Sequence, residues 1–66
     1  MHVTCEVVGE GTHDLELESG ATYGDVLDAV GLSSHEASVL VDGSPVPEDR
    51  TVDAESVRVL RLIKGG

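Results

Sequence analysis

The sequence has 66 residues, and a chain of this length forms one domain that buries only about 60% of its unfolded surface, which excludes a large internal active site. It has no Trp, no Phe and one Tyr, so the core must be built from Val, Leu, Ala and the single Ile. Thirteen acidic residues against four basic ones give a formal charge of -9, which disfavours non-specific binding to nucleic acid and predicts a solvated acidic shell suited to a salty cytoplasm.

The first 18 residues predict a β-hairpin. Residues 2–8 and 13–18 alternate between apolar and polar side chains, which is the period of a half-buried strand, and a glycine-rich turn separates them. The side chains expected on the inward face are Val3, Cys5, Val7, Leu15 and Leu17.

A short helix is predicted next. Thr22 followed by Asp25 forms a capping-box pattern at its start, and Gly31 stands where a left-handed C-cap is needed. Gly24 weakens the helix by about 1 kcal/mol relative to Ala, so its stability must come from packing on a sheet. Its apolar stripe consists of Tyr23, Val26, Leu27 and Val30.

The second half of the chain predicts three more strands. Residues 39–41 end at Asp42-Gly43, a strong hairpin-turn signal, and the two prolines in residues 44–47 allow only a short edge piece. Residues 56–63 form the most apolar strand. One helix can cover only one face of such a sheet, so the expected fold is α+β, with a four- to five-stranded mixed sheet in two layers. If residues 56–63 lie centrally, Val57 and Val59 face the helix, whereas Arg58 and Leu60 face outward.

The body of the chain does not predict chemistry of its own. Cys5, the only cysteine, lies in the apolar pattern of a strand, which indicates a core thiol. His2, His13 and His35 are separated, and no metal-ligand spacing or phosphate-binding loop is present. We therefore expect no catalytic residue, no metal and no bound cofactor. Without a signal peptide or membrane span, a cytoplasmic monomer is the simplest expectation.

The carboxyl end is the group with reactive potential. Gly65 and Gly66 place a carboxylate at the tip of a tail without side chains, so we divide the chain into a domain of residues 1–64 and a flexible tail of residues 65–66. An anionic carboxylate, with an ordinary pKa near 3.5, resists nucleophilic attack. Activation by a partner that uses ATP would convert it to an acyl adenylate, from which a thiol, a persulfide or an amine could take the acyl group.

The chain resembles the ubiquitin-like β-grasp proteins, and most closely the small archaeal modifier proteins. The resemblance covers the whole chain and rests on the strand order and on four segments: Tyr23-Gly24-Asp25-Val26-Leu27, Val39-Leu40-Val41-Asp42-Gly43, Pro45-Val46-Pro47-Glu48-Asp49 and Val59-Leu60-Arg61-Leu62-Ile63-Lys64-Gly65-Gly66. It implies adenylation by a ubiquitin-activating-type enzyme, isopeptide attachment to target protein lysines, and a second role as sulfur carrier, through a terminal thiocarboxylate, in tRNA thiolation.

The resemblance also implies roles for particular residues. Gly66 would be the acyl donor, with Gly65 giving clearance beside it. Lys64, the only lysine, would be the possible self-conjugation site, although its position beside the tail favours single attachments. The matching partner-binding patch on the open sheet face comprises Leu40, Arg58, Leu60, Arg61 and Leu62, and Arg58, Arg61 and Lys64 also predict a local basic spot.

Two alternatives remain open at this point. One is a dedicated sulfur carrier for molybdopterin or thiamine synthesis, which shares the activation step but not the acceptor. The other is a non-covalent β-grasp interaction domain whose glycines are incidental. The expected partners of the first reading are the activating enzyme, target lysines and sulfur-transfer or tRNA-thiolation enzymes, with no direct contact to nucleic acid.

Overall fold

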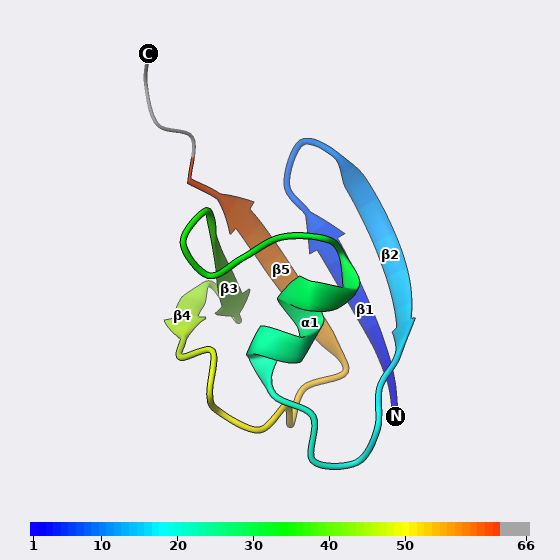
Figure 1. Cartoon of the computed structure of the whole chain (residues 1–66). Helices are drawn as coiled ribbons and strands as arrows, with labels where there is room; N and C mark the ends of the chain where they lie inside the picture. Colours follow the sequence, from blue (N-terminus) through cyan, green and yellow to red (C-terminus); the bar gives the residue numbers. More distant parts are fainter. Residues whose placement is uncertain (63–66) are drawn as a thin grey trace.

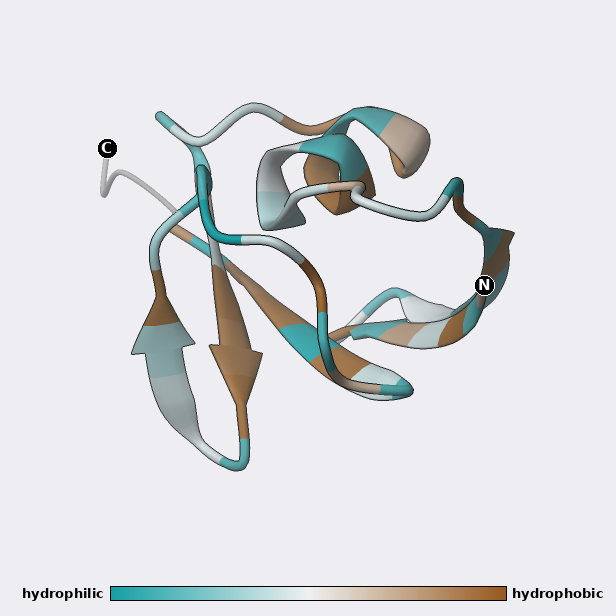
Figure 2. Cartoon of the chain, turned by 90° about the horizontal axis from the view of Figure 1, so that it is seen from below, coloured by the Kyte–Doolittle hydropathy of each residue, from teal (hydrophilic) through white to brown (hydrophobic). Residues whose placement is uncertain are grey.

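Five strands and one helix form two layers in the computed structural model, which describes residues 1–62 (Figure 1). The strands make one mixed sheet in the order β2-β1-β5-β3-β4, and the helix lies on one side of it (Figure 2). This confirms the expected α+β fold. The elements are β1 (His2–Val7), β2 (Gly11–Glu16), α1 (Tyr23–Ala29), β3 (Ala37–Val41), β4 (Ser44–Val46) and β5 (Ser56–Arg61).

The last strand occupies the centre of the sheet, which is the arrangement in which Val57 and Val59 are expected to face the helix. β5 runs parallel to β1 and antiparallel to β3. Val59 pairs with Val7 on one side and with Val39 on the other, and all three valines are at most 3% exposed. Such a row of β-branched side chains packs well beneath the helix, because each one fits the pleated surface of a sheet.

The two hairpins differ from the sequence prediction only in their bounds. β1 and β2 pair antiparallel, and β3 and β4 are joined by Asp42 and Gly43, whose φ angles of 54° and 80° fit the primed turn that such a sequence favours. β3 begins at Ala37, two residues earlier than predicted. Ala37 is a weak strand former, but it is 3% exposed and pairs with Arg61 of β5. Tertiary packing therefore overrides local propensity at this position.

The helix begins as predicted, with a complete capping box between Thr22 and Asp25, and Gly31 follows its end with a φ of 78°. Two further contacts at its start come from the segment that precedes β5. The backbone N–H of Tyr23 donates to the carbonyl of Arg50 at 3.0 Å, and that of Gly24 to the carbonyl of Glu48 at 2.7 Å. These bonds satisfy N–H groups that have no partner inside the helix and tie α1 to the 48–50 segment.

The core lies between α1 and the sheet. The buried side chains come from every element except β2 and β4, and residue 52 joins them from the connection before β5. The cluster consists of Val3, Cys5, Val7, Tyr23, Val26, Leu27, Ala37, Val39, Val52, Val57 and Val59.

Candidate functional site

The predicted acyl donor Gly66, its neighbour Gly65 and the possible self-conjugation site Lys64 lie outside the described residues. The structure does describe the strand that leads to them. Because β5 is paired on both sides, its end is the fixed point from which the last residues of the chain begin.

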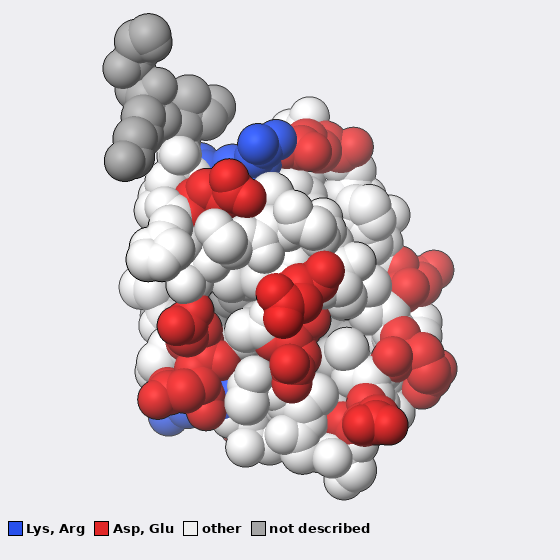
Figure 3. Space-filling model, viewed as in Figure 1, with Lys and Arg blue, Asp and Glu red and all other residues white. Residues whose placement is uncertain are grey.

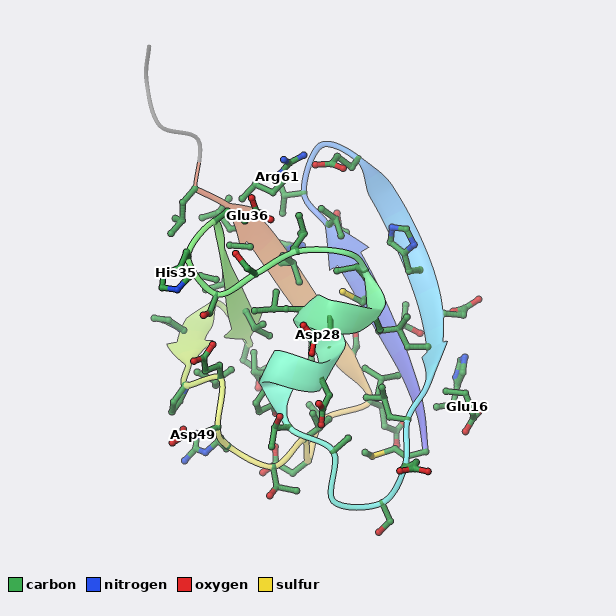
Figure 4. The ribbon with its side chains drawn as sticks, viewed as in Figure 1. Glu16, Asp28, His35, Glu36, Asp49 and Arg61 are labelled. Carbon is green, nitrogen blue, oxygen red and sulfur yellow. The ribbon has the colours of Figure 1, made fainter. Side chains whose placement is uncertain are left out.

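The end of β5 is held by contacts to both neighbouring segments (Figure 4). On the β1 side, the N–H of Val8 donates to the carbonyl of Val59 at 2.9 Å, and Nη1 of Arg61 lies 2.6 Å from Oε2 of Glu10. On the β3 side, the N–H of Leu62 donates to the carbonyl of Glu36 at 2.7 Å. The chain is thus ordered by specific contacts up to Leu62.

Three of the predicted patch residues, Leu40, Arg58 and Leu60, occupy the sheet face opposite the helix, and Leu62 follows the end of β5. Arg58 pairs with Leu40 of β3, and Leu60 follows on the same face, so Leu40 and Leu60 are diagonal neighbours about 7–8 Å apart. Leu60 is 42% exposed and Leu62 is 49% exposed. Alternating burial along β5 confirms that Arg58 and Leu60 point away from the helix.

Arg61 departs from that group. It pairs with the buried Ala37 and therefore shares the register of the helix-facing residues rather than that of Leu60. Its guanidinium reaches Glu10 in the β1–β2 turn, and hydrogen bonding to this carboxylate raises the pKa of Arg61 above its ordinary value. Arg61 belongs to the end of the sheet, beside the patch and not within it.

The predicted basic spot also needs correction. Arg58 lies 3.4 Å from Glu6, and Arg61 lies 2.6 Å from Glu10, so each guanidinium has a carboxylate partner. The third expected member, Lys64, lies outside the described residues. The sequence placed these basic residues close together but could not reveal the acids that the parallel pairing of β1 and β5 brings to them.

The structure adds Val8 to the exposed apolar surface. Val8 is 40% exposed and lines a shallow hollow of about 460 Å³ with Leu60 and Arg61. Its signal in the sequence is the pair Val7-Val8, which breaks the alternation of the first strand. We call Val8, Leu40, Leu60 and Leu62 the apolar patch.

The remaining candidate groups do not assemble into a reactive site within residues 1–62. Cys5 is fully buried, and burial raises the pKa of its thiol. The three histidines are exposed, and Nε2 of His2 lies 3.7 Å from Oδ1 of Asp14 on the surface. Over the same residues, no group of three or more potential ligand side chains is placed to hold a metal ion. The described part of the chain also contains no helix long and apolar enough to cross a membrane.

The sequence profile of small archaeal modifier protein 2 matches residues 1–63. The chain belongs to this family. A small archaeal modifier protein 2 from Haloferax volcanii is 58% identical over the full length of both chains. A protein of Archaeoglobus fulgidus without an assigned function is 31% identical, also over the full length of both.

Two solved structures have the same fold as this chain. The crystal structure of small archaeal modifier protein 2 from H. volcanii superposes with a TM-score of 0.76 at 56% identity, covering 97% of each chain. A ubiquitin-like protein from Caldiarchaeum subterraneum superposes with a TM-score of 0.59 at 20% identity, covering 100% of this chain and 99% of that one. The fold is therefore the ubiquitin-like β-grasp that the family resemblance implied.

Proposed function

We propose that this modifier is activated at Gly66 by a ubiquitin-activating-type enzyme and joined by an isopeptide bond to lysines of target proteins. The observation that carries the proposal is the course of β5. The central strand is held at its end by contacts from both sides and continues directly into Ile63-Lys64-Gly65-Gly66. The chain supplies the acyl group, and its partners supply the catalysis.

The chemistry requires three displacements. The Gly66 carboxylate attacks the α-phosphate of ATP and releases pyrophosphate, which gives an acyl adenylate. A thiolate of the activating enzyme then displaces AMP and forms a thioester, and a target lysine amine finally displaces the thiol and forms the amide. ATP is bound by the activating enzyme, so this chain needs no cofactor of its own.

Sulfur transfer shares the first displacement. A persulfide on the activating enzyme displaces AMP from the adenylate, and reduction of the resulting S–S bond by a second thiol leaves a thiocarboxylate on Gly66. That terminal sulfur would serve tRNA thiolation, as the family resemblance implies. A carrier dedicated to molybdopterin or thiamine synthesis would follow the same steps with another acceptor.

The apolar patch is the surface we assign to the enzyme partners. The large hydrophobic side chains exposed within residues 1–62 are Met1, Val8, Leu60 and Leu62, and the last three lie beside the end of β5. Leu40, the remaining member of the patch, is half-buried. The helix side of the molecule carries scattered carboxylates (Figure 3). A partner that binds at the end of β5 would therefore find apolar contact area there.

Expression of tagged wild-type and Gly66-deleted chains in the native host tests the proposal. Reductant-resistant bands of higher mass that vanish on deletion support conjugation, and replacement of a terminal oxygen by sulfur in the intact mass supports the carrier role. If the wild-type chain shows neither signal, both roles are wrong and the non-covalent β-grasp domain is favoured. That alternative predicts that deleting Gly66 changes no interaction.

The patch has a separate test. Leu60→Ser removes apolar area from an exposed position and should reduce conjugation several-fold while the melting temperature changes little. Leu60→Ile, which keeps the apolar area, is the matched control and should conjugate as the wild type does. If both variants conjugate equally well, Leu60 does not belong to the surface that binds the partners.

Self-conjugation should be rare. Lys64 is the only lysine in the sequence, and its neighbour Gly65 belongs to the reacting tail. Tryptic digestion after Lys64 should leave Gly-Gly on modified target lysines. Abundant linkages between copies of this chain, detected by mass spectrometry, would contradict the expectation of single attachments.

A further inference from the structure

Two turns hold the end of β5 from opposite sides. Glu10, in the turn between β1 and β2, binds the guanidinium of Arg61 at 2.6 Å. Glu36, in the connection between α1 and β3, accepts the N–H of Leu62 at 2.7 Å through its backbone carbonyl. Figure 4 shows Arg61 and Glu36 at the same end of the sheet, where β5 ends.

Each holding residue is itself fixed by its turn. The N–H of Glu10 donates to the carbonyl of Val7 at 2.9 Å. The N–H of Glu36 donates to the carbonyl of Ser33 at 3.1 Å, and the Glu36 side chain accepts the N–H of Ser33 at 3.2 Å. The two contacts therefore connect β5 to ordered backbone, and Arg61 is fixed in relation to the rest of the sheet.

We propose that Glu10 and Arg61 are positioning residues for activation of the carboxyl terminus. Their ion pair fixes the last residues of β5, so that the reacting carboxylate is presented from a defined point. This inference rests on the proposed function, because it concerns the same carboxylate. Neither side chain touches the reacting atoms, and their effect is transmitted through the backbone of β5.

The length of the remaining chain explains why the anchor matters. Four residues follow Leu62, and they span at most about 14 Å when fully extended. A fixed Leu62 therefore limits the volume that the carboxylate can sample. If the end of β5 were released, the activating enzyme would have to order it again, and ordering one residue reduces an association constant about tenfold.

The test substitution is Glu10→Gln, which removes the charge but keeps the size of the side chain. We expect KM for this chain in ATP–pyrophosphate exchange by the host's ubiquitin-activating-type enzyme to rise about twofold to fivefold, with kcat nearly unchanged, because an ion pair whose two side chains are each nearly half exposed is weak. Glu16→Gln is the matched control. This substitution makes the same change in net charge, and it also breaks an exposed ion pair, because Glu16 lies 3.0 Å from the amino group of Met1. Glu16 lies on β2, away from Arg61.

Two further measurements separate positioning from a general loss of stability. Hydrogen exchange at the Leu62 amide should accelerate in Glu10→Gln and stay at the wild-type rate in Glu16→Gln. The exchanged pair Glu10→Arg with Arg61→Glu should recover most of the wild-type KM, whereas Glu10→Arg alone should raise KM further because two guanidinium groups then face each other.

The outcomes are distinct. A KM for Glu10→Gln equal to that for Glu16→Gln, or a KM increase that the exchanged pair does not reduce, overturns the positioning role while leaving activation of the wild type intact. If the wild-type chain supports no exchange and Gly66 deletion makes no difference, the proposed function fails, and the positioning role fails with it. In that case the rate of hydrogen exchange at the Leu62 amide still shows whether the ion pair between Glu10 and Arg61 holds the end of β5.

Discussion

The hydroxyl of Tyr23 donates a hydrogen bond to Oδ1 of Asp53 at 2.9 Å, and the backbone N–H of Asp53 donates to the hydroxyl oxygen of Tyr23 at 3.5 Å. Tyr23 is the first residue of α1 and is fully buried, whereas Asp53 lies in the connection that precedes β5. The chain's only aromatic side chain therefore links the start of the helix to the segment leading into the central strand.

Tyr23→Phe should lower the free energy of unfolding by about 1 kcal/mol, because it removes a hydrogen bond while keeping the ring in the core. For a domain of this size the melting temperature should fall by about 4–8 °C. Thermal unfolding followed by circular dichroism measures the change. A melting temperature equal to that of the wild type would show that water replaces the lost bond at no cost.

Stability should decline in alkaline solution. Burial raises the pKa of Tyr23 above its ordinary value of 10.0 and that of Cys5 above 9.0. Because the unfolded chain loses these protons at lower pH than the folded chain, the stabilisation is complete below pH 9 and is lost as pH rises through the folded values. Denaturant unfolding at pH 8 and pH 11 should show the loss, and the variant combining Tyr23→Phe with Cys5→Ala should show a smaller one.

Gly24→Ala should fail to stabilise the helix, although Ala is about 1 kcal/mol better than Gly inside a helix. A Cβ at this position would lie 3.2 Å from the carbonyl oxygen of Glu48, and the Gly24 N–H already bonds that oxygen at 2.7 Å. The carbonyl would have to move and lengthen its bond. Asp28→Ala, at an exposed position of the same helix, is the control and should raise stability by a few tenths of a kcal/mol. A gain of the full propensity difference in Gly24→Ala would contradict this account.

The melting temperature should rise between low and molar KCl. The formal charge of -9 makes the folded chain repel itself, and screening shortens from about 10 Å at 0.1 M to about 3 Å at 1 M salt. The variant combining Asp28→Asn with Asp49→Asn removes two exposed charges, so it should melt higher than the wild type at low salt and respond less to KCl. A wild-type melting temperature that is unchanged or lower in molar KCl would contradict the prediction.

Local signals in the sequence were sufficient for most of the fold. The capping box of Thr22 and Asp25 marked the start of α1, and Asp42-Gly43 marked the turn between β3 and β4, because both are decided by residues a few positions apart. The apolar alternation of residues 56–63 predicts a strand, and its central place is the condition on which the predicted facing of its side chains depends. With the strand in the centre, alternation predicts Arg58 and Leu60 on the open face, and the structure agrees.

Contacts between distant segments could not be predicted in the same way. Glu10 and Arg61 are 51 positions apart, and their meeting depends on the parallel register of β1 and β5. The addition of Val8 to the apolar patch depends on the same register. Ala37 was missed for another reason, since its small side chain gives no periodic signal although packing against β5 buries it.

The central position of β5 has a consequence for biosynthesis. Both of its neighbours, β1 and β3, are made earlier, and without β5 they have no partner in the middle of the sheet. The two hairpins can pair earlier, but the sheet that joins them can form only after residues 56–61 have left the ribosome. A chain that terminates before this strand cannot complete the sheet, so the cell's proteases can remove it as an unfolded product.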